Sequence, residues 1–295
     1  MALQQFIEPL LSNQWLLSLV VLFVSLCVGS FLNVVILRLP KMMHQEWRCQ
    51  CEEFLAVPGG DPKPEETITL SRPASTCPSC GHRIKPWENI PVISYLFLRG
   101  KCSNCSTPIS IRYPLIEAVT AIFSLVTVWV LGPSVGTLWA LVLVWALIAL
   151  TMIDFDTQLL PDNITLPLMW LGLVLNYFGY LTDFNSAFWG AVAGYLSLWS
   201  VYWLFKLVTG KEGMGHGDFK LLAVIGAWLG WQLLPAVILL SSLVGAAVGI
   251  SLMVSRRHGR DVPIPFGPYL AAAGLLSLWF GDEILAGWYA WLGVA

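Results

Sequence analysis

The sequence predicts an all-α polytopic membrane protein with about eight transmembrane helices and one small polar domain between the first two. Composition is the first reason: 57% of the 295 residues are hydrophobic and only 12% are charged, whereas soluble domains carry about 25% charged residues. The second reason is that the charges gather between long apolar stretches. The formal net charge of -2 gives no sign of a nucleic-acid partner, so the lipid bilayer is the expected surrounding.

Eight apolar stretches are long enough to span a membrane, alone or with partners. They cover residues 15–37, 115–131, 137–153, 164–181, 187–208, 219–231, 233–254 and 266–291. The sixth is short for a hydrocarbon layer of about 30 Å, and the last can break near Gly281, Asp282 and Glu283.

The lysines and arginines predict the orientation, because they concentrate in cytoplasmic loops. All 16 fall at or within the first-to-second, fifth-to-sixth and seventh-to-eighth loops. With eight spans these three loops share one side, so we expect that side to be cytoplasmic and both termini to lie outside. The predicted organisation is a first helix over residues 1–39, a cytoplasmic loop domain over 40–112, and a membrane domain of about seven helices over 113–295.

The cytoplasmic loop contains the clearest metal-binding pattern. Two C-x-x-C pairs, 21 residues apart, are formed by Cys77 with Cys80 and Cys102 with Cys105. Four thiolates in this spacing suit a closed tetrahedral zinc site, which folds a small domain and leaves no position for a catalytic water. A pair of disulfides is the alternative, but the reducing cytoplasm disfavours it. The other cysteines are expected to be free thiols: Cys27, Cys49 and Cys51.

Two aspartates lie where apolar stretches meet polar loops. Asp218 follows Gly215-His216-Gly217 directly, and Asp154 ends the third apolar stretch. The structural alternative for Asp218 is an N-cap of the following helix. Asp154 is harder to explain structurally, because it meets the negative end of a helix dipole. Two such acids at one membrane surface can share a proton and activate water, as in aspartic proteases.

Two further aspartates compete with Asp154 for this role. Asp156 lies farther into the polar turn, whereas Asp154 continues the apolar register from Ile153. Asp162 follows Pro161 and is typical of a cap for the fourth helix. We therefore favour Asp154 as the partner of Asp218. The sequence contains no His-Glu-x-x-His pattern that would indicate a metal-dependent hydrolytic site.

Several motifs, in order along the chain, resemble those of the bacterial type IV prepilin peptidases, which are intramembrane aspartic proteases of the Gly-x-Gly-Asp class. They occupy residues 29–33, 38–40, 88–91, 112–117, 153–162, 213–222 and 263–269, together with the two cysteine pairs. The similarity covers most of the chain apart from residues 42–71 and the last dozen. It implies Asp154 and Asp218 as the catalytic pair.

The resemblance also implies the reaction. Such an enzyme, in the bacterial inner membrane, removes the short basic leader of type IV prepilins and type II secretion pseudopilins, cutting after a glycine on the cytoplasmic side. The substrate continues from the cut as an apolar helix. The resemblance further implies methylation of the new N-terminal residue, often phenylalanine, with S-adenosylmethionine.

Residues for methyl transfer would lie in or beside the cysteine loop, and Glu88, Asn89 and Glu117 are the candidates. Each has a structural alternative: Asn89 can cap a turn, Glu88 can pair with Arg83 or Lys85, and Glu117 can pair with Arg112. No Gly-x-Gly-x-x-Gly motif after a strand marks a separate nucleotide-binding domain.

Two other classes of protein fit parts of the sequence. One is a non-enzymatic, zinc-stabilised membrane scaffold of a secretion machine, in which both acids are caps. The other is a proton-coupled transporter that uses the acids as relays, although such proteins place acids near the bilayer midplane and usually carry repeats. Glycine pairs of the G-x-x-x-G type at Gly190 with Gly194 and at Gly226 with Gly230 favour close packing, chiefly among the protein's own helices.

Overall fold

The computed structural model describes residues 13–55, 68–254 and 264–293. Within these ranges the regular structure is helical, apart from two isolated β-bridges in the cysteine loop. The predicted all-α class is therefore confirmed. The chain divides into two compact units, residues 1–129 and 130–295.

The first unit is built around one long helix. Its elements are α2 (Gln14–Leu55), the 3₁₀ helix η1 (Pro86–Asn89), α3 (Ile93–Phe97) and α4 (Arg112–Leu131). Helix α2 passes through Pro40 and runs to Leu55, so the polar loop expected from residue 40 begins as helix. The segment after Pro40 contains neither glycine nor proline and is rich in good helix formers, which explains the continuation. The three-part domain division stays a prediction.

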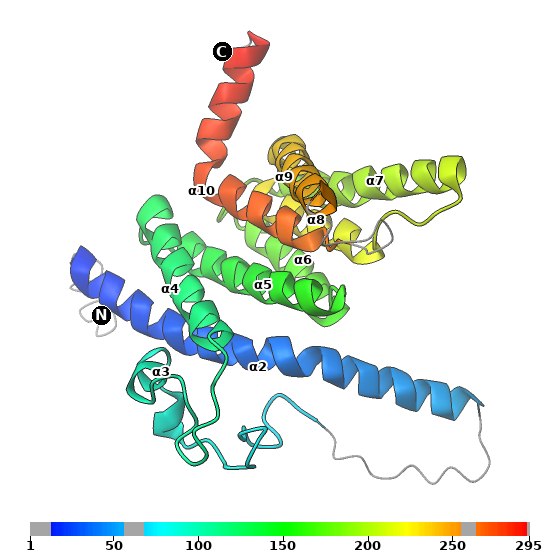
Figure 1. Ribbon diagram of the computed structural model, residues 1–295. Coiled ribbons are helices and arrows are strands. Elements are labelled where there is room, and N and C mark those ends of the chain that lie inside the picture. The colour runs from blue at the N-terminus through cyan, green and yellow to red at the C-terminus, as the bar shows by residue number, and fades with distance from the viewer. Residues whose placement is uncertain (1–12, 56–67, 255–263, 294–295) are drawn as a thin grey trace. The chain divides into compact units, whose positions relative to one another are not determined.

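Helices α2 and α4 touch at a glycine. A Cβ added at Gly29 would lie 2.7 Å from the Cα of Glu117, so only glycine lets the two backbones approach this closely. One turn later, Asn33 Nδ2 donates a hydrogen bond of 3.2 Å to the carbonyl oxygen of Tyr113. Figure 1 shows α4 meeting α2 near the middle of α2. These contacts set the framework on which the cysteine loop is held.

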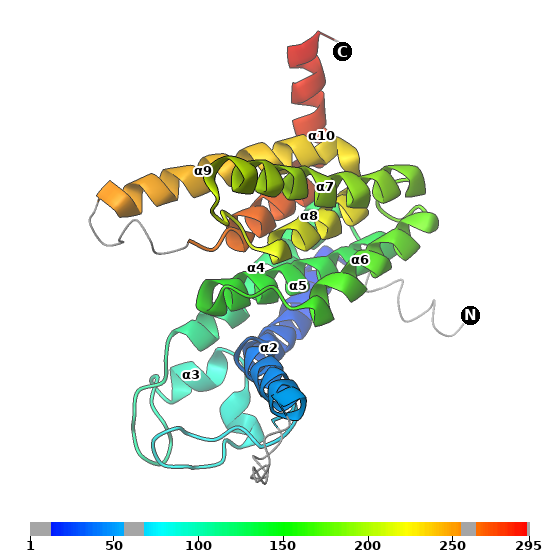
Figure 2. The ribbon, with the colours of Figure 1, turned by 90° about the vertical axis from the view of Figure 1, so that its right-hand side faces the viewer.

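The second unit is a helical bundle with α8 at its centre. Its elements are α5 (Val135–Thr157), α6 (Asp162–Tyr177), α7 (Phe184–Thr209), α8 (His216–Leu229), the 3₁₀ helix η2 (Trp231–Leu233), α9 (Leu234–Val254) and α10 (Gly267–Leu292). Helix α8 packs against α6, α7 and α10, and every residue from Leu221 to Trp228 is buried. Figure 2 shows α7 running alongside α8. Because α8 is enclosed in this way, the residues at its start are fixed by three neighbours.

Glycines bring α7 and α8 into backbone contact. Gly190 and Gly226 face each other so closely that a Cβ on either would overlap the backbone of the other. A Cβ at Gly194 would lie 2.6 Å from the carbonyl oxygen of Leu222. The interpretation that the G-x-x-x-G glycines pack the protein's own helices is confirmed for these positions.

Among the residues that the structure describes, six helical segments are long and apolar enough to cross a membrane: α2, α4, α5, α7, residues 231–252 with most of α9, and α10. Helices α6 and α8 have 16 and 14 residues, which at 1.5 Å per residue gives roughly 24 and 21 Å. Both are shorter than a hydrocarbon layer of about 30 Å, so eight full spans are not confirmed.

The last helix bends where the sequence suggested. Phe280 has the non-helical angles φ −125° and ψ 25° inside α10, which confirms the expected break beside Gly281. Figure 1 shows the two arms of α10 at an angle. The predicted basic loop with Arg256, Arg257 and Arg260 lies outside the described residues.

Candidate functional site

Asp154 is buried in the last turn of α5 and is held there by another helix. Its side chain is 5% exposed, and its Oδ2 accepts a hydrogen bond of 3.0 Å from the backbone N–H of Gly267. Gly267 is the first residue of α10, where backbone N–H groups have no partner within the helix. The positive end of α10 therefore offsets the unfavourable dipole of α5 at Asp154. Asp156, two residues later, is exposed.

Asp218 lies in the first turn of α8 and does not cap it. The N-cap is Gly215, and no side chain makes a capping hydrogen bond there, so the N-cap alternative for Asp218 is wrong. The Asp218 side chain is 6% exposed. A Cβ at Gly215 would lie 3.7 Å from Asp218 Oδ2, so the glycine loop covers one side of this carboxyl group without crowding it.

The two acids meet beside Leu160. A Cβ at Gly217, next to Asp218, would lie 2.7 Å from the Cβ of Leu160. Gly267 donates the hydrogen bond to Asp154, and a Cβ at Gly267 would lie 3.4 Å from Leu160 Cδ1. The two carboxyl groups are near enough to repel each other when both are ionised. The end of α5, the start of α8 and the start of α10 thus bring together the two carboxyl groups chosen from the sequence.

Neighbouring side chains hold the glycine loop and α6 in place. The His216 ring packs against Tyr202 of α7 in a tilted arrangement, with ring centroids 5.0 Å apart. Lys220 Nζ lies 2.7 Å from both carboxylate oxygens of Asp162. The N-cap of α6 is Pro161, so the expectation that Asp162 caps this helix is wrong; it joins α6 to α8 instead.

The four predicted cysteines come together in the first unit. The Sγ atoms of Cys77, Cys80, Cys102 and Cys105 all lie within 4.8 Å of one another, and Cys77 Sγ is 3.7 Å from Cys105 Sγ. Tetrahedral coordination with metal–sulfur bonds of about 2.3 Å implies about 3.8 Å between sulfurs. The cluster therefore fits a metal ion. All seven cysteines are free, as expected for Cys27, Cys49 and Cys51.

The two cysteine loops have matching backbone geometry. Cys77 N–H donates to the carbonyl of His82, and Cys102 N–H donates to that of Thr107, each at 2.9 Å. In both loops the residue after the second cysteine has positive φ: Gly81 at 70° and Ser106 at 58°. Hydrogen bonds from the side chain and then the backbone of Thr107 lower the pKa of Cys105 to about 6, which favours the thiolate that binds metals.

A cavity of about 640 Å³ opens beside the cysteine cluster, between α2, the cysteine loop and the start of α4. Glu88, Asn89 and Glu117 all line it, so the structure brings the three methyl-transfer candidates to one place. Asn33 and Arg38 of α2 line it as well. Both belong to the motifs noted in the sequence, but nothing in the pattern alone indicated that they face the same cavity.

Glu88 is fixed by the loop that carries the first cysteine pair. Its Oε2 accepts hydrogen bonds from the Lys85 backbone N–H at 2.9 Å and from His82 Nε2 at 3.2 Å. The pairing expected with the side chain of Arg83 or Lys85 is replaced by these contacts. The Lys85 N–H, the Ser103 hydroxyl and then His82 lower the pKa of Glu88 to about 2, so this carboxylate is ionised at neutral pH.

Glu117 is buried and holds a strained segment. Its side chain is 8% exposed, and its Oε2 accepts a hydrogen bond of 2.7 Å from the backbone N–H of Val92. Val92 has φ 58°, which is unfavourable for a β-branched residue. Strain of this kind persists where surrounding structure imposes it, often at functional sites. Asn89 lies exposed at the end of η1.

Comparison with known proteins gives the same division of the chain. Residues 23–131 match the bacterial peptidase A24 N-terminal domain, and residues 141–250 match the type IV leader peptidase family. The first match ends at residue 131, within two residues of the boundary between the two compact units. No solved structure matches the chain.

Three similar curated proteins carry the same name, prepilin leader peptidase/N-methyltransferase. A protein of Pseudomonas putida is 56% identical over 89% of this chain and 90% of its own length. A protein of Pseudomonas aeruginosa is 53% identical over 94% of this chain and 95% of its own length. A protein of Aeromonas salmonicida is 54% identical over 93% of this chain and 94% of its own length. The chain belongs to the type IV leader peptidase family.

Proposed function

We propose that this protein cleaves the leader from type IV prepilins and methylates the new N-terminus. The observation that supports leader cleavage is the pair of buried acids, Asp154 and Asp218, at the ends of two helices. The Gly267 N–H donates a hydrogen bond to Asp154. The name shared by relatives more than 50% identical supports both halves. A scaffold whose acids merely cap helices does not account for this arrangement, because neither carboxyl group caps its own helix.

The two acids divide the work of hydrolysis. Repulsion between neighbouring carboxylates keeps one protonated while the other is ionised. The ionised group takes a proton from water as the water oxygen attacks the scissile carbonyl carbon, and the protonated group donates to the carbonyl oxygen. When the tetrahedral intermediate collapses, the C–N bond breaks and a proton passes to the leaving amine. The Gly267 N–H orients Asp154 throughout.

Two features support a substrate that reaches the acids from the membrane. Helices α5 and α10, which meet at Asp154, are long and apolar enough to span. Lys206 and Lys220 bracket the loop before Asp218, which is predicted to be cytoplasmic. We therefore assign the protein to the bacterial inner membrane, with the acids at its cytoplasmic face. Type II secretion pseudopilins, which share the leader and apolar helix, are proposed as further substrates.

The 640 Å³ cavity of the first unit is proposed to bind S-adenosylmethionine. Its volume lies within the range of about 300–1,000 Å³ typical of small-molecule sites. Glu88 and Glu117 offer negative charge for the cationic methyl donor and the substrate amine, and Arg38 and Lys41 offer positive charge for the donor's carboxylate. When bound, the donor supplies the methyl group; the residues position both partners and accept the proton that the amine releases.

Zinc is proposed as the ion held by the four cysteines, in a structural role. All four positions of a tetrahedral site are filled by thiolates, so none remains for water. The cysteine loop is too small to fold by a hydrophobic core alone, and metal binding would supply the missing stability. Since Glu88 and Asn89 belong to this loop, zinc would act on methylation by shaping the cavity.

Cys102→Ser is expected to release zinc and to abolish methylation while leaving most leader cleavage intact. The measurements are metal content of the purified protein and mass spectrometry of the processed substrate. Cys51→Ser, which removes an exposed thiol outside the cluster, is the matched control and should retain both. Full methylation by Cys102→Ser protein that contains no zinc would contradict the structural role.

Glu117→Gln is expected to lower the methylation rate about 10²-fold while cleavage remains near wild type. The amide oxygen of glutamine can still accept the Val92 N–H bond, so the change removes charge and proton acceptance but keeps the contact. Loss of a positioned general base costs about 10²–10⁴-fold. Glu46→Gln, an exposed change on α2, is the control. Equal methylation by both variants would exclude Glu117 from the reaction.

The direct test is to reconstitute the purified protein in vesicles with a full-length prepilin and isotopically labelled S-adenosylmethionine. Mass spectrometry should find the free leader and a mature chain carrying one labelled methyl group on its terminal nitrogen. An intact substrate after prolonged incubation would overturn the cleavage half. A cleaved but unmethylated product would overturn the methylation half.

A further inference from the structure

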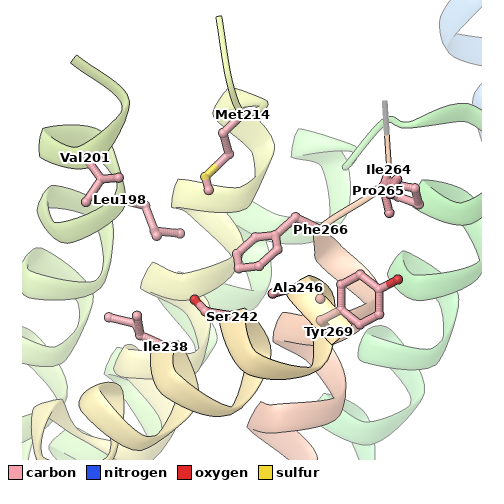
Figure 3. A pocket seen from close by; sticks show the side chains of 11 residues that line it. Leu198, Val201, Met214, Ile238, Ser242, Ala246, Ile264, Pro265, Phe266 and Tyr269 are labelled. Carbon is pink, nitrogen blue, oxygen red and sulfur yellow. The ribbon is translucent and has the colours of Figure 1, made fainter. Parts of the chain in front are cut away.

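An apolar pocket of about 340 Å³ lies in the second unit, beside the paired acids. It is bounded by α7, α9, the glycine loop and the start of α10 (Figure 3). The two segments that touch the acids both contribute to its wall. Met214 directly precedes Gly215, which covers Asp218, and Phe266 directly precedes Gly267, which donates to Asp154.

The lining selects for an apolar occupant. Ser242 and Tyr269 are the polar side chains among the described lining residues, and none of these residues is charged. Figure 3 shows the side chains of Met214 and Phe266 extending into the space between α7 and α9. Val201, on the α7 side of the opening, is 55% exposed, so a group held by a neighbouring apolar helix can reach the pocket.

We propose that this pocket binds an apolar side chain of the substrate from the mature side of the scissile bond, within the first turns of its hydrophobic helix. The inference rests on the proposed function and adds the surface that positions the substrate. A basic leader is excluded, because a charge without a partner in an apolar pocket is strongly unfavourable. The apolar segment just after the cut has the required chemistry, and a pocket bordered by both acid-bearing segments is within its reach.

Ala246→Phe tests the proposal by filling the pocket from α9, with Ala247→Phe as the matched control. Both alanines are exposed, but Ala246 lines the pocket and the adjacent Ala247 is not part of the lining. Since losing a good apolar contact weakens binding about 10-fold or more, Ala246→Phe should raise KM for prepilin by that factor with kcat unchanged. Equal KM values for both variants and wild type would overturn the proposal.

The outcomes separate this inference from the proposed function. If wild type and Ala247→Phe release no leader, the proposed function fails. If they cleave normally and Ala246→Phe matches them, the pocket assignment alone fails.

A second measurement does not depend on the stability of Ala246→Phe. A photoreactive benzophenone side chain at position 246, in full-length Asp218→Asn protein, should crosslink to the first turns of the mature segment of a bound prepilin. Crosslinks confined to the leader, or to lipid only, would overturn the assignment.

Discussion

Asp154→Asn and Asp218→Asn are each expected to reduce leader cleavage by about 10³-fold or more, with prepilin binding retained. Asparagine keeps the size of the side chain, and its amide oxygen can still accept the Gly267 N–H bond at position 154. The substitution removes the capacity of the side chain to take or give a proton. Because catalytic residues that act as a unit depend on one another, the loss of either one removes most of the rate enhancement. The rate is measured as leader release under single-turnover conditions.

Asp156→Asn is the matched control for this prediction. Asp156 lies two residues from Asp154 on the same helix end but is exposed, so its replacement should leave cleavage near wild type. If Asp156→Asn loses cleavage and Asp154→Asn retains it, the catalytic partner of Asp218 is Asp156 and not Asp154.

Gly267→Ala is expected to lower cleavage about 10²-fold without unfolding the protein. A Cβ at this position would lie 2.5 Å from Asp154 Oδ2, which is too close, so the carboxyl group must move. Displacement of a catalytic group by about 1 Å can cost 10²-fold in rate. The measurement is single-turnover leader release, together with the thermal unfolding midpoint to show that the bundle remains folded.

Gly287→Ala on the same helix is the control for Gly267→Ala. A Cβ at Gly287 would meet nothing within 4 Å, so cleavage should be unchanged. If Gly267→Ala also cleaves at the wild-type rate, the contact between α10 and Asp154 has no part in positioning the acid.

The residues whose roles could be predicted from sequence are those marked by local pattern. The C-x-x-C spacing was sufficient to group Cys77 with Cys80 and Cys102 with Cys105, because a metal site repeats a short loop twice. The position of Asp154 at the negative end of a helix dipole marks it as an acid that needs a partner, and the structure supplies one in the amide of Gly267. That partner is 113 residues away in sequence, and no local pattern relates the two positions.

The differences from expectation have two physical causes. Pro40 suggested the end of the first helix, but one proline did not outweigh the helix-forming residues that follow it. Asp162 carried the signature of a cap, yet Lys220 from α8 offered a stronger, ionic partner. The strained Val92 segment is likewise fixed by a buried acid on another helix, Glu117. Tertiary contacts decided the positions of Asp162 and Val92, whereas local helix propensity decided the course of the chain after Pro40.

The most direct test of the paired-acid mechanism is the single-turnover cleavage rate of the double variant Asp154→Asn/Asp218→Asn beside each single variant. If the two carboxyl groups act as one unit, the double variant should cleave no more slowly than the slower single variant. A double variant whose loss equals the product of the two single losses, or a single variant that cleaves like wild type, would contradict the mechanism.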